Sequence, residues 1–196
     1  MSQDEPEIRR ASITDAPRIA RMHVASWIET YRGLVPDEML ATLSVARRTT
    51  AWERILRDPL KADKTVVYVK EVGRAFAGFG ACGEQRDGNL KARGFDAEIG
   101  SLYVLREFQR RGIGRALMNV LANDLGDRGF HGVALWVLRD NAPARRFYEQ
   151  CSGELVGEKS DVRGGTVLVE MAYGWHEIHT LIQRAQLVGP QGSLKS

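Results

Sequence analysis

Apolar residues in the first third of the chain recur at the spacing of amphipathic helices. A short stretch at residues 7–12 is typical of a first strand, and a helix is predicted over 14–33, where Thr and Asp can cap its start. A second helix is predicted over 36–58, with a basic interruption at Arg47-Arg48. The chain therefore begins with one strand and two helices.

Alternating and continuous apolar runs dominate the remainder, and residues 85–94 between them read as a polar loop. We predict strands over 65–72, 75–84, 97–105 and 132–138, a closing pair of strands at 153–160 and 166–175 joined by a turn at 161–165, a helix ending at about residue 128 and a helix capped by Asn141. This order predicts an α+β, or mixed α/β, protein with one sheet and helices on both faces.

Composition narrows the class of protein. A length of 196 residues fits one domain, and 43% hydrophobic with 27% charged residues is ordinary for a soluble protein. Cys82 and Cys151 are the only cysteines, which excludes a disulfide framework and favours two reduced thiols in or near a core. No apolar run reaches ~18 residues and the start lacks a signal sequence, so we expect a cytoplasmic protein without a membrane partner.

The net charge of +3 argues against a nucleic-acid partner, although the sequence pI is 9.0. Nucleic-acid binding usually needs a clustered basic face, and no long block of like charges appears. The segment His176-Glu177-Ile178-His179 is not the HExxH zinc motif, because its second histidine comes one residue too early. We therefore expect no metal.

The octet QRRGIGRA (109–116) lies between an alternating strand and a helix. It lacks the lysine of a Walker A loop and the third glycine of a dinucleotide fingerprint. A glycine-rich helix start still favours an anion, because the first-turn N–H groups are free and the helix dipole attracts negative charge. The arginines of the octet add positive charge. The alternative is a glycine-flexed turn with a solvated arginine face.

Two spaced motifs carry a resemblance to a known family. The segment AEIGSLYVLREFQRRGIGRALM (97–118) resembles the acyl-CoA-binding core of the GNAT superfamily of N-acetyltransferases, with its Gln/Arg-x-x-Gly-x-Gly/Ala motif. NAPARRFY (141–148) is similar to the family's Asn-x-x-Ala-x-x-x-Tyr helix. The resemblance covers roughly residues 7–174 and implies a central, mostly antiparallel, splayed sheet. Residues 175–196 then form a C-terminal extension, with disorder expected at 188–196.

The resemblance implies acetyl-CoA as co-substrate, with pantetheine inserted between the strands at 98–104 and 133–138. Gln109 would brace the turn, and Asn141 would contact the cofactor near its thioester. Backbone groups of Leu102, Tyr103 and Val104 would pair with pantetheine, and the pyrophosphate would bind the backbone N–H groups of Arg110, Arg111, Gly112, Ile113, Gly114, Arg115 and Ala116.

The implied reaction is attack of a neutral primary amine on the thioester within a ternary complex. Glu98, on the cofactor strand, is the candidate base, and its alternative interpretation is an ion pair with an arginine. The family places a proton-donating tyrosine at Tyr148, whose alternative role is packing beside Phe147. The oxyanion would bind a backbone N–H of the splayed strand, for which Val104 is the candidate.

The acceptor is expected to be a small-molecule amine or a peptide or protein amine. Because the first two helices border the acceptor site in the family, Trp27 and Tyr31 are predicted to bind substrate, and selectivity is expected from 26–36 and 160–165. A non-catalytic acyl-CoA-binding sensor is the alternative function. A homodimer is also allowed for.

Overall fold

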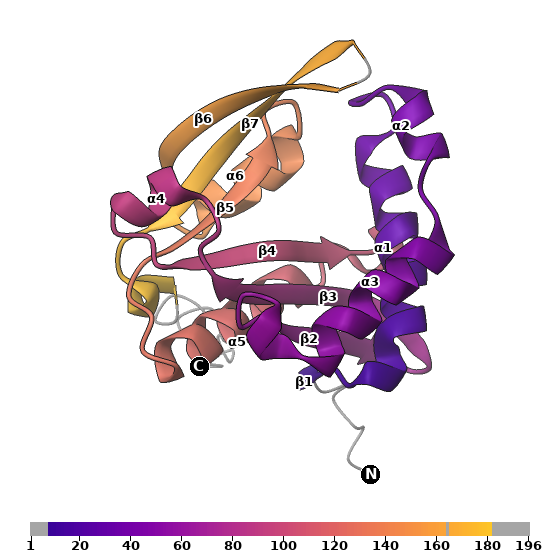
Figure 1. Ribbon diagram of the computed structural model, residues 1–196, viewed down its shortest axis with the longest axis horizontal. Coiled ribbons are helices and arrows are strands. Elements are labelled where there is room, and N and C mark those ends of the chain that lie inside the picture. Colours follow the sequence, from indigo (N-terminus) through magenta and orange to yellow (C-terminus); the bar gives the residue numbers. More distant parts are fainter. Residues whose placement is uncertain (1–7, 164, 182–196) are drawn as a thin grey trace, which may run out of the picture.

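The computed structural model describes residues 8–163 and 165–181. Its seven strands form one sheet in the order β1-β2-β3-β4-β5-β7-β6, in which all neighbours are antiparallel except the parallel pair β4–β5 (Figure 1). The strands are β1 (Ile8–Arg10), β2 (Val66–Val72), β3 (Ala75–Glu84), β4 (Ala97–Val104), β5 (Val133–Leu138), β6 (Glu154–Arg163) and β7 (Thr166–Trp175). All predicted strands are present, and the predicted mixed, mostly antiparallel sheet is confirmed.

Six α-helices connect the described strands. They are α1 (Ala16–Tyr31), α2 (Asp37–Ala41), α3 (Val45–Arg57), α4 (Gly88–Ala92), α5 (Ile113–Asp127) and α6 (Ala142–Gln150). Short 3-10 turns precede α1 at Ile13–Asp15 and follow β4 at Arg106–Phe108.

Two predicted connections are wrong. The single helix predicted over 36–58 is two helices, α2 and α3, and the break lies at residues 42–44 instead of at the arginines. Ser44 causes this break, because its backbone is extended and its hydroxyl accepts the Arg47 N–H as an N-cap. The segment 85–94, predicted as a loop, contains α4, which Asp87 caps through the N–H groups of Asn89 and Leu90.

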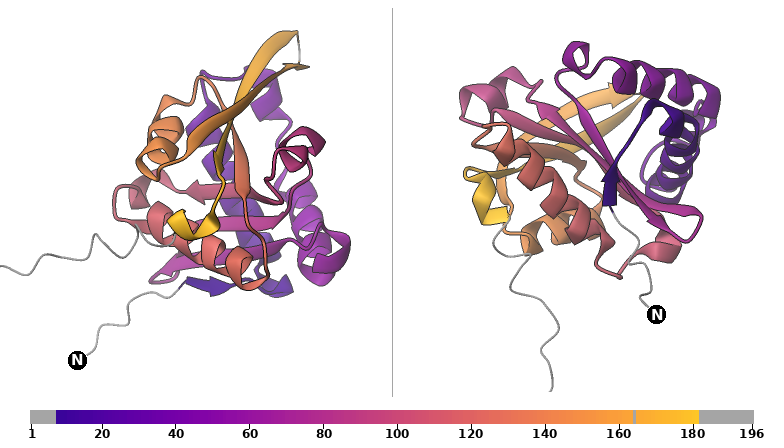
Figure 2. Two further views of the ribbon diagram at one scale, coloured as in Figure 1. Left: turned by 90° about the vertical axis from the view of Figure 1, so that its left-hand side faces the viewer. Right: turned by 90° about the horizontal axis from the view of Figure 1, so that it is seen from below.

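Helices cover both faces of the sheet (Figure 2). On one face α1 and α3 pack together and bury a cluster that includes Ile19, Trp52 and Phe79. On the other face α5 lies against β2, β3 and β4. Glycine allows this close approach, since a Cβ at Gly80 would lie 2.6 Å from Cδ1 of Leu121.

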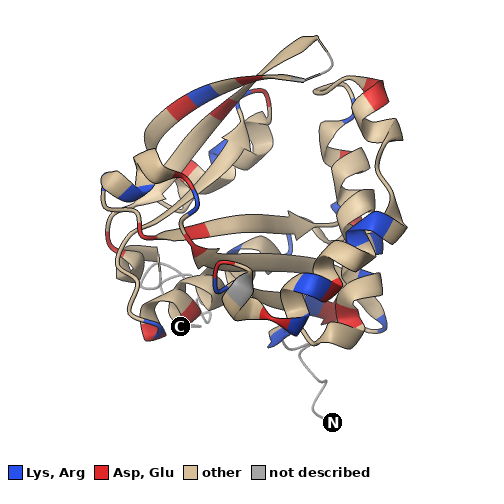
Figure 3. Ribbon diagram, viewed as in Figure 1, with Lys and Arg blue, Asp and Glu red and all other residues tan. Residues whose placement is uncertain are grey.

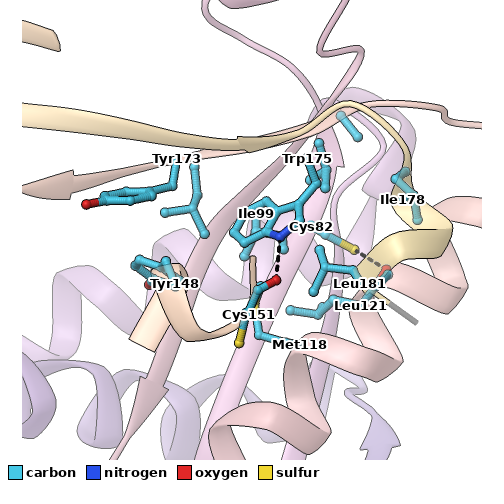
Figure 4. Close-up of a cluster of buried hydrophobic side chains, with 14 of the residues drawn as sticks. Cys82, Ile99, Met118, Leu121, Tyr148, Cys151, Tyr173, Trp175, Ile178 and Leu181 are labelled. Carbon is cyan, nitrogen blue, oxygen red and sulfur yellow. Dashed lines mark hydrogen bonds between the residues drawn. The ribbon is translucent and has the colours of Figure 1, made fainter. Parts of the chain in front are cut away.

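The described part of the C-terminal extension packs on the domain. Ile178 and Leu181 are buried in the same cluster as Tyr148, and Trp175 Nε1 donates to the Cys151 carbonyl at 2.8 Å (Figure 4). The boundary after residue 174 stays a prediction, and the disorder predicted at 188–196 lies outside the described residues.

Both cysteines are buried and free, as expected. Acidic and basic residues are intermixed over the described elements (Figure 3). In the same part of the chain, no helix is long and apolar enough to cross a membrane.

Candidate active site

Strands β4 and β5 separate shortly after they meet. Their pairing consists of Ala97 with Val133 and Glu98 with Ala134, whereas β4 continues beside β3 as far as Val104 and β5 continues beside β7 (Figure 1). The second half of β4 therefore has one edge without a neighbouring strand among the described residues. Such an edge offers backbone N–H and C=O groups to a ligand.

The alternation of backbone groups decides which residues of β4 face this splay. The Leu105 N–H donates to the Ala77 carbonyl of the β3 side, so its neighbour Val104 and, two residues earlier, Leu102 point their backbone groups away from β3. Both residues are thus placed for the expected backbone role. Tyr103 is not, because its backbone faces β3 and its side chain faces the opposite side of the sheet from α5.

The turn after β4 is held against the end of that strand. Gln109 Nε2 donates to the Val104 carbonyl at 2.9 Å, and the backbone reaches positive φ at Arg110 (60°) and at Gly112 (79°), the N-cap of α5. Ile113 is buried and anchors the first turn of the helix. The first-turn N–H groups, which cannot bond within the helix, therefore open at the end of the splay.

The side chains of the octet differ in exposure. Arg110 and Arg111 are exposed, and the Arg111 guanidinium lies 5.6 Å from the Phe108 ring centroid. Arg115 is half-buried and Ala116 is exposed. Positive charge thus surrounds the helix start, as an anion site requires.

Helix α6 flanks the same end of the splay. A Cβ on Gly114 would lie 3.4 Å from Cζ of Phe147, so α5 and α6 approach closely here. Asn141 is buried and caps α6, with its Oδ1 accepting the Ala144 N–H at 3.3 Å. Tyr148 follows seven residues after this cap, so it shares a helix face with Asn141.

Tyr148 lies in an aromatic cluster with Tyr173 and Trp175 (Figure 4). Its ring also contacts that of Phe147. Burial, with Tyr103 nearby, raises the pKa of the Tyr148 phenol well above its usual range. The phenol therefore stays protonated at neutral pH. The cluster suits packing, and the raised pKa keeps the phenol in the protonated form that a donor must have but makes loss of that proton less favourable.

A cavity of about 280 Å³ lies on the opposite face, between the α1–α3 pair and the strands β3 and β4. Its wall includes His23, Trp27, Arg48, Trp52, Glu98 and Tyr103. A β-bulge at Gly100 shapes it, because Ser101 pairs with Ala81 whereas Ile99 pairs with Cys82. Without this extra residue, Glu98 and Tyr103 would point to opposite faces of the sheet.

Glu98 is buried and accepts three hydrogen bonds from Arg86. They come from the Arg86 backbone N–H at 3.3 Å, from Nε at 3.0 Å and from Nη2 at 2.5 Å. The ion pair given as the alternative for Glu98 is therefore present. A carboxylate has about four acceptor sites, so this pair leaves little capacity for another proton donor unless Arg86 moves.

Aromatic side chains close the cavity near the middle of β4. Trp27 Nε1 donates to the Tyr103 hydroxyl at 2.9 Å, and the Tyr31 ring packs edge-on against Trp27 with the ring centroids 4.8 Å apart. Trp52 Nε1 donates to His23 Nδ1 at 3.2 Å. Burial, assisted by the charge of Arg48, lowers the pKa of His23 to about 3, so His23 is neutral near pH 7.

The sequence patterns do not indicate several of the cavity residues. Arg86 lies in the segment predicted as a loop, and Arg48 lies in the basic interruption of a predicted helix. Nothing local marks either residue as part of a site. The bulge had a signal, because an isolated glycine such as Gly100 within a strand pattern indicates one.

Other candidates are accounted for locally. The His176 ring packs on Phe95 at 4.6 Å, and His179 Nε2 lies 2.9 Å from the Glu177 carboxylate. Among the described residues, no group of three or more His, Cys, Asp or Glu is placed to hold a metal ion.

Comparison with known proteins identifies the family to which the chain is similar. The profile of the acetyltransferase (GNAT) family matches residues 26–153. An uncharacterized N-acetyltransferase of Bacillus subtilis, YuaI, is 31% identical over 174 residues, which cover 89% of this chain and 95% of that protein.

Solved structures share the fold. An N-acetyltransferase from Staphylococcus aureus Mu50 is similar with a TM-score of 0.67 at 17% identity, covering 88% of this chain and 98% of that one. The PaiA N-acetyltransferase of Thermoplasma acidophilum, solved in complex with coenzyme A, gives 0.62 at 20% identity, covering 86% and 98%. The predicted GNAT-like fold is confirmed.

Proposed function

Because the chain belongs to the acetyltransferase (GNAT) family, we propose that it moves the acetyl group of acetyl-CoA to a primary amine by direct attack within a ternary complex. The observation that carries this proposal is the splay of β4 from β5, which ends at the glycine-capped start of α5. A free strand edge leading to a helix N-terminus suits a ligand with an extended amide arm and a terminal diphosphate.

The residues present fit coenzyme A. Leu102 and Val104 turn their backbone groups toward the splay, Gln109 holds the turn, and the first-turn N–H groups of α5 can bind phosphate. The exposed Arg110 and Arg111 add charge beside them. When bound, acetyl-CoA would supply the activated acetyl thioester. A structural neighbour from Salmonella typhimurium was solved with acetyl-CoA as its cofactor.

Proton transfer falls to two residues on opposite sides of the splay. A lysine-like amine has a pKa of about 10.4, so only ~1 in 2,500 molecules is neutral at pH 7. Glu98, on the cavity wall, would take the amine proton directly or through water. Arg86 would first have to move so that a carboxylate oxygen of Glu98 becomes free to accept it. Tyr148, kept protonated by burial, would return a proton to the leaving thiolate.

The test is release of free thiol from acetyl-CoA over a panel of amines that includes polyamines, amino acids, aminoglycosides and peptide N-termini. Turnover with at least one class supports the proposal. Binding of acetyl-CoA by calorimetry with no thiol released by any class would overturn it in favour of a non-catalytic sensor.

A further inference from the structure

Arg48 is an arginine on the cavity wall. It comes from α3, and its guanidinium carbon lies 5.5 Å from the Trp27 ring centroid. Its charge also affects the pKa values of His23 and Tyr103, so it lies close to both. No Asp or Glu among the described residues forms an ion pair with it.

The other charged groups of the cavity are compensated. Glu98 is paired with Arg86, and Glu84 is paired with Lys64 at 2.5 Å. His23 is neutral near pH 7. The half-buried Arg48 therefore leaves one positive charge without a counterion in the part of the chain that the structure describes, and a charge withdrawn from water favours an anionic partner.

We propose that the acceptor is a small amine that also carries an anionic group, a carboxylate or a phosphate, which Arg48 binds. This inference rests on the proposed function and names its substrate class. An amine lacking an anion would bring an ammonium into a cavity that already holds an uncompensated cation. An amine with an anionic group neutralises Arg48, and the cavity of about 280 Å³ suits a small molecule.

The test compares amines that differ in the anion alone. Glycine, β-alanine and 4-aminobutyrate are assayed beside their carboxamides, with phosphoethanolamine as the phosphate arm, at saturating acetyl-CoA. We expect at least one anionic amine to exceed its uncharged counterpart about tenfold in kcat/KM. Arg48→Gln should reduce kcat/KM for anionic amines about tenfold and for carboxamides less than twofold, with the KM for acetyl-CoA unchanged.

Two variants control for folding and for charge. Arg47→Gln removes the exposed neighbouring arginine of the same helix and should leave both classes of amine unchanged. Arg48→Lys should retain part of the preference, because lysine keeps the charge but not the planar fork. Equal losses for both classes in Arg48→Gln, or no preference in the parent, would overturn the inference.

Thermal shifts with the same compounds separate this inference from the proposed function. If no amine releases thiol, the proposed function fails, and stabilisation still reports whether Arg48 binds anions. Stabilisation of the parent, but not of Arg48→Gln, by the anionic compounds alone supports the anion site. Equal shifts in both proteins, or none in the parent, overturn it.

Discussion

Where β4 and β5 separate, the two faces of the sheet offer a ligand different groups: mainly backbone groups on one face and side chains on the other. On the α5–α6 face, the proposed cofactor side, the candidate ligand-binding groups are backbone groups and glycines within the segment 102–116. The cavity on the α1–α3 face, the proposed acceptor site, is lined by side chains that α1, α3, β3, β4 and the chain after β3 contribute. A binding site formed by backbone groups recurs wherever its short motif occurs, whereas a cavity lined by side chains depends on the whole fold. The first therefore identifies the family, and we expect the second to determine which acceptor is used.

The largest effect is expected on the cofactor side, at Tyr148 of α6. Tyr148→Phe keeps the ring packing but removes the proton donor, so kcat should fall about 100-fold or more while the KM for acetyl-CoA changes less than about twofold. Thiol release at saturating amine measures both constants. Tyr173→Phe is the matched control, because the Tyr173 hydroxyl bonds Glu149 and Arg145 instead of the site. Unchanged turnover in Tyr148→Phe would contradict the assignment of Tyr148 as the proton donor.

On the cavity side, Glu98→Gln should reduce kcat/KM for the amine about 10- to 100-fold. The loss should be greatest at low pH, where more of the amine is protonated and a base is most needed. A pH series of parent and variant gives the ratio directly. Glu84→Gln, which removes the other cavity carboxylate, should give a ratio close to one throughout. A Glu98→Gln ratio that stays constant across pH argues against the base and leaves the Arg86 pair as a structural feature.

The sequence predicts the backbone features of the cofactor side better than the side-chain contacts of the cavity. The αL glycine at Gly112 and the Asn141 cap are local features, so the sequence motifs predicted the helix starts that the structure shows. The Arg86–Glu98 pair joins residues that become neighbours only when β3 and β4 pair. Arg48 reaches the cavity because α3 packs on α1. Such contacts depend on tertiary packing, which periodicity and motifs do not specify.

The cavity also predicts an acid-sensitive contribution to stability. The pKa of His23 is about 3 in the folded chain and about 6.5 when unfolded, so the unfolded state binds more protons between these values. The contribution of His23 is present above pH 6.5 and is lost as the pH falls. Between pH 6.5 and 5 it should amount to about 2 kcal/mol of unfolding free energy.

Urea titrations of parent and His23→Gln at the two pH values measure this contribution. The glutamine side chain can still accept from Trp52, so the variant should lose about 2 kcal/mol less on acidification than the parent does. His131→Gln, which removes an exposed histidine, should lose the same unfolding free energy between the two pH values as the parent. Identical acid sensitivity of parent and His23→Gln would mean that His23 becomes protonated without cost.

The smallest effect separates backbone geometry from ligand binding on the cofactor side. Gly112 and Gly129 flank α5 with φ of +79° and +82°, and neither has an atom within 4 Å of an added Cβ. Each alanine substitution should therefore cost roughly 1 kcal/mol of stability through its left-handed backbone. Gly112→Ala alone should raise the KM for acetyl-CoA, about fivefold, because it disturbs the turn that presents the first N–H groups of α5. Equal KM values for the two variants would show that the turn does not hold the cofactor.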